Sequence, residues 1–237
     1  MKAMLLAAGL GTRLRPLTET LPKPLLALAG KPMIEYHIEK LVAAGVRDLV
    51  INVSYLGELI EAALGDGARC GARIRYSREP EGPLDTGGGL RRALSLLGAE
   101  PFLLVAGDIW SDFPYRRLVD HALAAGQLGH LVVVPNPPQH QAGDFALDAR
   151  GRLNRDGNGR NCTYSGIALL APEILAGWDE TIFPLREPLR RAATHGALGG
   201  ECWEGEWEDV GTVERYRALN RRLEQKQEQG GSAGPAI

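Results

Sequence analysis

Two glycines and several cations follow the first apolar run of the sequence. The run at residues 4–8 ends at Gly9, and Gly11, Arg13 and Lys23 come shortly after it. Glycines allow backbone N–H groups to approach an anion closely, and arginine and lysine side chains can neutralise the charge that builds on a triphosphate. This segment is therefore a candidate for binding phosphate groups.

The segment differs from two other phosphate-binding motifs. Leu14 stands where the third glycine of a Rossmann fingerprint would be, and no Gly-Lys-Ser/Thr follows to complete a Walker A loop. A glycine turn alone would equally fit a plain connection between a strand and a helix. Residues 9–24 as a whole match the pattern G-x-G-x-R-x-x-P-x-T followed by P-K-P, and here the chain resembles the sugar nucleotidylyltransferase family.

The resemblance implies an Mg²⁺-dependent enzyme that transfers a nucleoside monophosphate from a nucleoside triphosphate to a sugar 1-phosphate. It implies an aspartate after a central strand, and Asp108 follows the apolar run at 102–106. On its own, Asp108 fits a turn or a helix cap equally well. The resemblance also implies a late W-x-D-x-G-T pattern, which residues 207–212 supply with Asp209. Two carboxylates can hold Mg²⁺ while phosphate oxygens and water complete its octahedron.

By the same resemblance, Arg13 and Lys23 are the expected catalytic cations. Arg13 would contact the leaving pyrophosphate, and Lys23 would contact the α-phosphate or the incoming sugar phosphate. The nucleotide base would lie at residues 79–89, where three consecutive glycines give room for a flat ring; a flexible loop before a helix is the alternative. The expected nucleotide-binding residues are Leu6, Ala8, Gly9, Gly11, Thr12, Arg13, Lys23, Leu84, Thr86 and Gly87.

Further strings resemble family members that use UTP and N-acetylmuramate 1-phosphate in peptidoglycan recycling. These strings lie at residues 34–37, 83–89, 143–145 and 164–167. The resemblance therefore implies UTP and this sugar 1-phosphate as substrates. Thymidylyl or guanylyl transfer to a hexose 1-phosphate stays open, as does a non-catalytic subunit that senses nucleotide sugars. The expected sugar-binding residues are Ala106, Gly143, Asp144 and Ser165.

The chain departs from the family pattern at two places on the sugar side. Many relatives carry a second lysine that grips the sugar phosphate, but no lysine occurs between Lys40 and Lys226. Arg155 or Arg160 could replace it. Ala106 stands where relatives of the muramate type tend to have asparagine, so one hydrogen bond to the sugar is expected to be missing.

Apolar runs that alternate with helical spacing must position these residues. The runs at 49–53, 102–106 and 131–134, like the one at 4–8, are typical of buried strands, and residues 32–44 and 85–97 have the spacing of helices. This order predicts an α/β fold with a Rossmann-like mixed, mostly parallel sheet flanked by helices. Ligands of such sheets bind beyond the carboxyl ends of the strands, where the candidate residues fall.

The second half of the chain is expected to complete the site. Residues 135–160 are rich in Pro, Gly, Asn and Asp, which predicts an inserted β region over the site. Residues 203–211 return to the core, and Thr212 caps a charged helix that runs to about Gln229. We therefore expect one nucleotidyltransferase domain at residues 1–229 and a mobile tail at 230–237.

Composition narrows the class of partner. The net charge of −2 argues against nucleic acid or an anionic membrane as a partner. No apolar run reaches the ~20 residues that span a bilayer, and glycines and arginines interrupt the apolar start before it could form a signal peptide. Three widely spaced cysteines suggest buried reduced thiols. We expect a cytoplasmic enzyme, and the sequence leaves open whether it forms a homo-oligomer.

Overall fold

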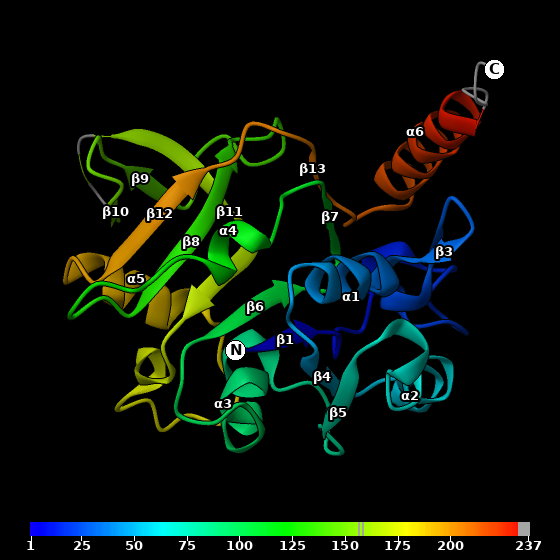
Figure 1. Ribbon diagram of the computed structural model, residues 1–237, viewed down its shortest axis with the longest axis horizontal. Coiled ribbons are helices and arrows are strands. Elements are labelled where there is room, and N and C mark those ends of the chain that lie inside the picture. Colours follow the sequence, from blue (N-terminus) through cyan, green and yellow to red (C-terminus); the bar gives the residue numbers. More distant parts are fainter. Residues whose placement is uncertain (156, 158, 232–237) are drawn as a thin grey trace.

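A nine-stranded mixed sheet forms the centre of the computed structural model, which describes residues 1–155, 157 and 159–231 (Figure 1). Its strands follow the order β10-β9-β11-β6-β1-β4-β5, with β8 beside β11 and β12 beside β8. The β6-β1-β4-β5 block is parallel, and β11 runs antiparallel to its neighbours. This confirms the predicted fold class. The strands are β1 (Lys2–Leu6), β4 (Asp48–Val53), β5 (Arg73–Arg78), β6 (Phe102–Ala106), β8 (Gly129–Pro135), β9 (Phe145–Leu147), β10 (Leu153–Asn154), β11 (Arg160–Leu170) and β12 (Leu198–Cys202).

Helices cover both faces of the sheet because the inner strands are apolar on both sides. In β1, Ala3 and Leu5 belong to a core that includes Ile38 of α1, whereas Met4 belongs to a second core that includes Leu90 of α3. The predicted helices at 32–44 and 85–97 are therefore α1 and α3, on opposite faces. The helices are α1 (Met33–Ala43), α2 (Gly57–Leu64), α3 (Asp85–Leu97), α4 (Arg116–Val119), α5 (Arg186–Thr194) and α6 (Val213–Gly231).

Strand β11 creates a fork in the sheet. Its first part, Arg160 to Cys162, pairs with β9, and its last part, Ile167 to Leu170, pairs with β6 on the same edge, while β8 occupies the other edge. The pairing with β8 shifts register between Tyr164 and Ile167. Gly166 lies in this shift with φ 84°, and a Cβ there would be 2.8 Å from Cβ of Ala106. The inserted β region thus diverges from β6 next to the end of that strand.

Two short strand pairs complete the fold. β7 (Ile109–Ser111) pairs with β13 (Trp207–Asp209), which is the predicted return of the chain to the core. β2 (Ala27–Leu28) and β3 (Lys31–Pro32) form a hairpin that α6 contacts through Leu219 and Leu223. Of the three cysteines, which form no disulfide, Cys162 is buried and the other two are half-buried, which corrects the expectation that all are buried.

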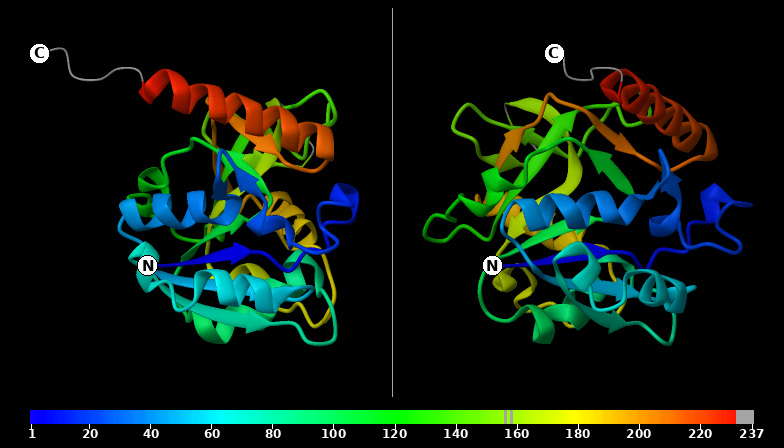
Figure 2. Two further views of the ribbon diagram at one scale, coloured as in Figure 1. Left: turned by 90° about the vertical axis from the view of Figure 1, so that its right-hand side faces the viewer. Right: turned by 45° about the vertical axis from the view of Figure 1, so that its right-hand side comes forward.

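The C-terminal helix α6 extends from the body of the molecule (Figures 1 and 2). As predicted, the Thr212 hydroxyl caps it by accepting a hydrogen bond from the backbone N–H of Arg215 at 3.3 Å. The helix runs to Gly231, so residues 230 and 231 of the predicted tail are helical, and residues 232–237 lie outside the described part. Within that part of the chain, no helix combines the length and the apolar character that crossing a bilayer requires.

Candidate active site

The loop after β1 folds tightly around Gly11. The carbonyl oxygen of Gly11 accepts hydrogen bonds from the backbone N–H of Leu14 at 2.9 Å and from the hydroxyl of Thr18 at 2.8 Å. Its φ of 62° favours glycine, and a Cβ there would lie 3.0 Å from the Thr18 side chain. A Cβ on Gly9 would meet nothing within 4 Å, because Gly9 faces an open cleft.

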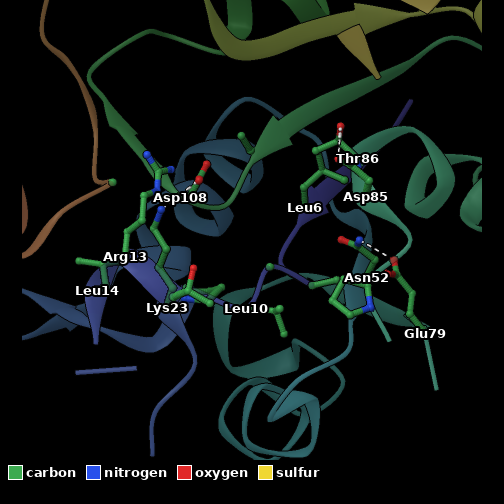
Figure 3. Close-up of a pocket in the computed structure, with 18 of the residues that line it drawn as sticks. Leu6, Leu10, Arg13, Leu14, Lys23, Asn52, Glu79, Asp85, Thr86 and Asp108 are labelled. Atoms are coloured by element: carbon green, nitrogen blue, oxygen red, sulfur yellow. Dashed lines mark hydrogen bonds and ion pairs between the residues drawn. The ribbon is translucent and has the colours of Figure 1, made fainter. Parts of the chain in front are cut away.

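This cleft has a volume of about 540 Å³, within the usual range for a site that binds a small molecule. It lies beyond the carboxyl ends of β1, β4 and β6, as predicted for a sheet of this kind. Figure 3 shows Arg13, Lys23 and Asp108 together at one end of it and Asp85 and Thr86 at the other. The predicted nucleotide-binding residues that line the cleft are Leu6, Ala8, Gly9, Gly11, Thr12, Arg13, Lys23 and Thr86.

Lys23 and Arg13 present the two positive charges of the cleft in different ways. Lys23 is only 8% exposed, and its Nζ donates to Oδ2 of Asp108 at 2.9 Å. Pro22 and Pro24 flank it in a short 3-10 turn, which restricts its backbone. Arg13 is exposed and forms no ion pair with any residue that the structure describes. Its charge is therefore available to a ligand.

Asp108 and Asp209 lie side by side, although 101 positions separate them in the chain. Asp209 stands opposite Ile109 in the β7–β13 pair, and the backbone N–H of Val210 donates to the carbonyl oxygen of Asp108 at 3.1 Å. Position 107, directly before Asp108, requires glycine because a Cβ there would be 2.5 Å from the carbonyl oxygen of Leu6. Arg215 donates to Oδ2 of Asp209 at 2.9 Å.

These two carboxylates suit a metal ion that a substrate helps to bind. The residues that the structure describes contain no group of three or more His, Cys, Asp or Glu that could hold a metal by themselves. Mg²⁺ is commonly bound in proteins by one or two carboxylates together with substrate phosphates and water. The pair of Asp108 and Asp209 beside a cationic cleft meets that requirement.

A buried hydrogen-bond network, which the sequence analysis missed, forms the other end of the cleft. The side-chain amide of Asn52 accepts from the backbone N–H of Ala7 at 2.9 Å and donates to Oε1 of Glu79 at 2.8 Å. Oε2 of Glu79 accepts from the backbone N–H of Leu84 at 2.8 Å. The network ties the ends of β1 and β4 to the loop before α3. The only signal in the sequence is that Asn52 interrupts an apolar run.

The three glycines at the start of α3 do not provide room for a base. A Cβ on Gly87 would be 2.3 Å from the ring of Phe183, and one on Gly88 would be 2.2 Å from the carbonyl oxygen of Thr181. The space beside them is filled by the segment before α5. Leu84 and Gly87 are not among the residues that line the cleft, and this end of it is lined by Pro83, Asp85, Thr86 and Ile182.

A second cavity of about 380 Å³ opens at the fork between β6 and β9. Its lining includes Ser165 from β11, Trp207 from β13, and His140 from the inserted region. It also includes both predicted metal ligands, Asp108 and Asp209. Four residues line this cavity and the cleft alike, so the two spaces adjoin: Leu6, Thr86, Ala106 and Asp108.

The predicted sugar-binding residues divide into two groups. Ala106 and Ser165 line the second cavity, although the Ser165 hydroxyl donates to the carbonyl oxygen of Val132 at 2.7 Å. Gly143 and Asp144 are not among its lining residues. Instead, Asp144 supports the wall, because its carboxylate accepts from the backbone N–H of Tyr164 at 2.9 Å and lies 3.2 Å from Nε2 of His140.

Neither arginine proposed to replace the missing lysine reaches this cavity. Arg155 and Arg160 are absent from its lining, and Arg160 forms an exposed ion pair with Glu204 at 2.5 Å. The arginine that does line the cavity is Arg186, the first residue of α5.

Comparison with known proteins identifies the family of the chain. The sequence profile of the family described as nucleotidyl transferase matches residues 2–155. The chain belongs to the nucleotidyl transferase family. The matched residues include the glycine loop, both predicted catalytic cations and Asp108.

Relatives of this nucleotidyl transferase match along most of their length. This chain is 43% identical to an N-acetylmuramate alpha-1-phosphate uridylyltransferase from Neisseria meningitidis, over 92% of this chain and 96% of that protein. It is 36% identical to an enzyme of the same name from Caulobacter vibrioides, over 93% and 96% of the two chains. The solved structure of HddC from Yersinia pseudotuberculosis with GMP-PN has a similar fold, with a TM-score of 0.77 over 94% and 99% of the chains at 22% identity.

His37 of this nucleotidyl transferase supports the backbone next to Asp108 through a hydrogen bond. Its Nε2 donates to the carbonyl oxygen of Ile109 at 2.8 Å, so Nδ1 accepts from the Tyr115 hydroxyl at 2.7 Å. Burial lowers the pKa of His37 to about 4, which keeps the ring neutral near pH 7. Its bond to the carbonyl oxygen of Ile109 holds β7 in place next to Asp108.

Proposed function

We propose that this nucleotidyl transferase transfers UMP from UTP to N-acetylmuramate 1-phosphate and releases pyrophosphate. The observation that carries the proposal is the pair of adjoining cavities that share Asp108, with Lys23 bonded to that carboxylate at the boundary. The choice of substrates is supported by the 43% identity to the Neisseria meningitidis enzyme over 92% of the chain. This activity consumes a nucleoside triphosphate, which favours a cytoplasmic enzyme.

In this proposal, UTP occupies the larger cleft. Its triphosphate lies along the loop at Gly9 and Gly11, which lines the cleft, and its base lies toward Asp85 and Thr86. Arg13 binds the phosphates that leave as pyrophosphate. The Asn52–Glu79 network fixes the distance between the two ends of the cleft, since its bonds join β1 to the loop before α3.

The sugar 1-phosphate occupies the second cavity and brings its phosphate to the shared boundary. One phosphate oxygen attacks the α-phosphorus in line; a new P–O bond forms, and the bond from the α-phosphorus to the bridging oxygen of pyrophosphate breaks. The attacking group is already an anion near neutral pH, so no side chain needs to remove a proton. Positioning and charge neutralisation by Lys23 and Arg13 therefore provide most of the rate.

Asp108 and Asp209 are the residues that would hold Mg²⁺. When bound there, Mg²⁺ would neutralise charge on the phosphate oxygens and help to align the two substrates. Because Lys23 and Arg215 pair with these carboxylates, both aspartates are held in place before substrates arrive.

The proposal is tested by a panel of substrates. Pyrophosphate release is measured with UTP, TTP and GTP against N-acetylmuramate 1-phosphate, N-acetylglucosamine 1-phosphate, glucose 1-phosphate and mannose 1-phosphate. We expect the highest kcat/KM for UTP with N-acetylmuramate 1-phosphate, and loss of activity with EDTA that Mg²⁺ restores. A higher kcat/KM for TTP or GTP than for UTP, or for a hexose 1-phosphate than for N-acetylmuramate 1-phosphate, would refute the proposed substrates in favour of those with the higher value.

A further inference from the structure

The second cavity has two walls that belong to opposite faces of the sheet. On one wall, Ile109 and Trp207 join the core that contains α1, and Asp108 and Asp209 lie with them. On the other wall, Leu185 joins the core that contains α3. A sugar whose phosphate lies at the two aspartates therefore extends toward the second wall.

Arg186 presents a positive charge on that second wall. Its Nε donates to Oε1 of the neighbouring Glu187 at 3.2 Å, an exposed contact of the kind that contributes little. Among the residues that the structure describes, its Nη1 and Nη2 atoms donate no hydrogen bond, and Glu187 is its one ion-pair partner. The backbone is nevertheless fixed, because the N–H of Leu185 donates to the Thr86 hydroxyl at 2.9 Å.

The other basic side chain in the cavity lining has a partner. Besides Arg186, the lining contains His140, whose ring nitrogen lies 3.2 Å from the carboxylate of Asp144. Lys23 and Arg13 line the larger cleft and not this cavity. Arg186 is thus the arginine available to a negative group of a sugar that sits away from the phosphate.

Tyr164 adds an unpartnered donor to the same wall. Its ring packs against the core that contains α3, and its hydroxyl is buried without a hydrogen-bond partner among the described residues. Buried polar atoms normally have partners, and a ligand in the cavity that Tyr164 lines could supply one. Burial raises the pKa of the Tyr164 phenol above its usual range, so it remains protonated and can donate.

We propose that Arg186 and the Tyr164 hydroxyl form a subsite for a carboxylate on the sugar substrate. The guanidinium fork matches a carboxylate with two parallel hydrogen bonds, which suits this group better than a single ammonium would. The inference rests on the proposed function, because N-acetylmuramate differs from N-acetylglucosamine by a lactyl ether that ends in a carboxylate. The subsite would distinguish the two sugars.

The test compares kcat/KM for N-acetylmuramate 1-phosphate and N-acetylglucosamine 1-phosphate, each with UTP, in the full-length enzyme. We expect Arg186→Ala to lower the ratio of the two values about 30-fold and Tyr164→Phe to lower it about fivefold, the losses typical of hydrogen bonds to a charged group and to a neutral donor. Arg190→Ala is the matched control, because Arg190 contacts the same Glu187 at 3.5 Å but does not line the cavity. It should leave the ratio unchanged.

The outcomes separate this subsite from the proposed function. If the wild-type enzyme prefers N-acetylmuramate 1-phosphate but Arg186→Ala lowers both values by the same factor, Arg186 serves the phosphate or the fold, and the subsite is refuted. If Arg186→Ala changes neither value, the subsite is refuted as well. If the wild-type enzyme does not prefer N-acetylmuramate 1-phosphate, the proposed function fails and the subsite fails with it.

Discussion

Replacing Lys23 with methionine would remove one positive charge from the boundary between the two cavities while keeping most of the side-chain volume. Lys23 is 8% exposed, so its stem is packed and the methionine side chain can occupy the same space. Its partner Asp108 has a side chain that is 46% exposed, and water can solvate this carboxylate once the ammonium is gone. The loss of folding stability should therefore stay near ~1 kcal/mol, as for an exposed ion pair.

Catalysis should respond much more strongly than stability. In the transition state, Lys23 would stabilise charge on the phosphate groups, and one such donor typically contributes ~3 kcal/mol, or about a hundredfold in kcat. The assay is pyrophosphate release at saturating UTP and sugar 1-phosphate, with thermal unfolding measured on the same samples. Lys31→Met is the control, because Lys31 pairs with Glu39 on the surface and lines neither cavity.

Three outcomes can be read from these two lysine variants. A kcat reduced about a hundredfold in Lys23→Met, with near-normal unfolding and a normal Lys31→Met, supports the assignment. A kcat within fivefold of wild type in a folded Lys23→Met protein would show that Lys23 does not stabilise the transition state. A loss in Lys31→Met as large as in Lys23→Met would point to a general effect of surface charge.

Other positions give further expectations. Asn52→Ala should lower the free energy of unfolding by about 2–3 kcal/mol in urea titrations, because buried partners on two strand ends lose their bonds; an unchanged midpoint would contradict the network. Gly88→Ala should cost about 1–3 kcal/mol in the same assay, since its Cβ would be 2.2 Å from a carbonyl oxygen, whereas Gly9→Ala should fold normally and raise the KM for UTP. Burial lowers the pKa of His37 to about 4, so between pH 6.5 and 4 the unfolded chain binds more protons than the folded chain. The free energy of unfolding should therefore decrease as the pH is lowered, by about 2 kcal/mol from pH 7 to 5. This slope should be lost in His37→Gln, and an equal slope in both proteins would refute the assignment.

The sequence predicted the parts of the site that depend on local patterns. Apolar runs followed by glycine located the ends of β1 and β6, and these ends do carry the glycine loop and Asp108. The W-x-D-x-G-T pattern located Asp209, and the β7–β13 pair brings it beside Asp108. In each case the signal lies in a short stretch of chain: the end of an apolar run for Gly9 and Asp108, and the motif implied by the family resemblance for Asp209.

Contacts between distant segments could not be predicted in this way. Gly87 and Gly88 of α3 pack against Phe183 and Thr181, more than ninety positions later in the chain, so the local sequence could not show why glycine is needed there. Glu79 and Asn52 meet because β4 and β5 are neighbours, a fact that depends on the pairing of strands. The fork of β11 likewise requires knowledge of which strand occupies each edge.

The four residues common to both cavities have a consequence for inhibition. A nucleotide sugar that spans both spaces must lie across Leu6, Thr86, Ala106 and Asp108. It would therefore exclude UTP and the sugar phosphate at once, and inhibition by this product should be competitive with either substrate. A compound that joins a uridine moiety to a sugar mimic by a short linker would gain from the same geometry, because binding of one half raises the effective concentration of the other.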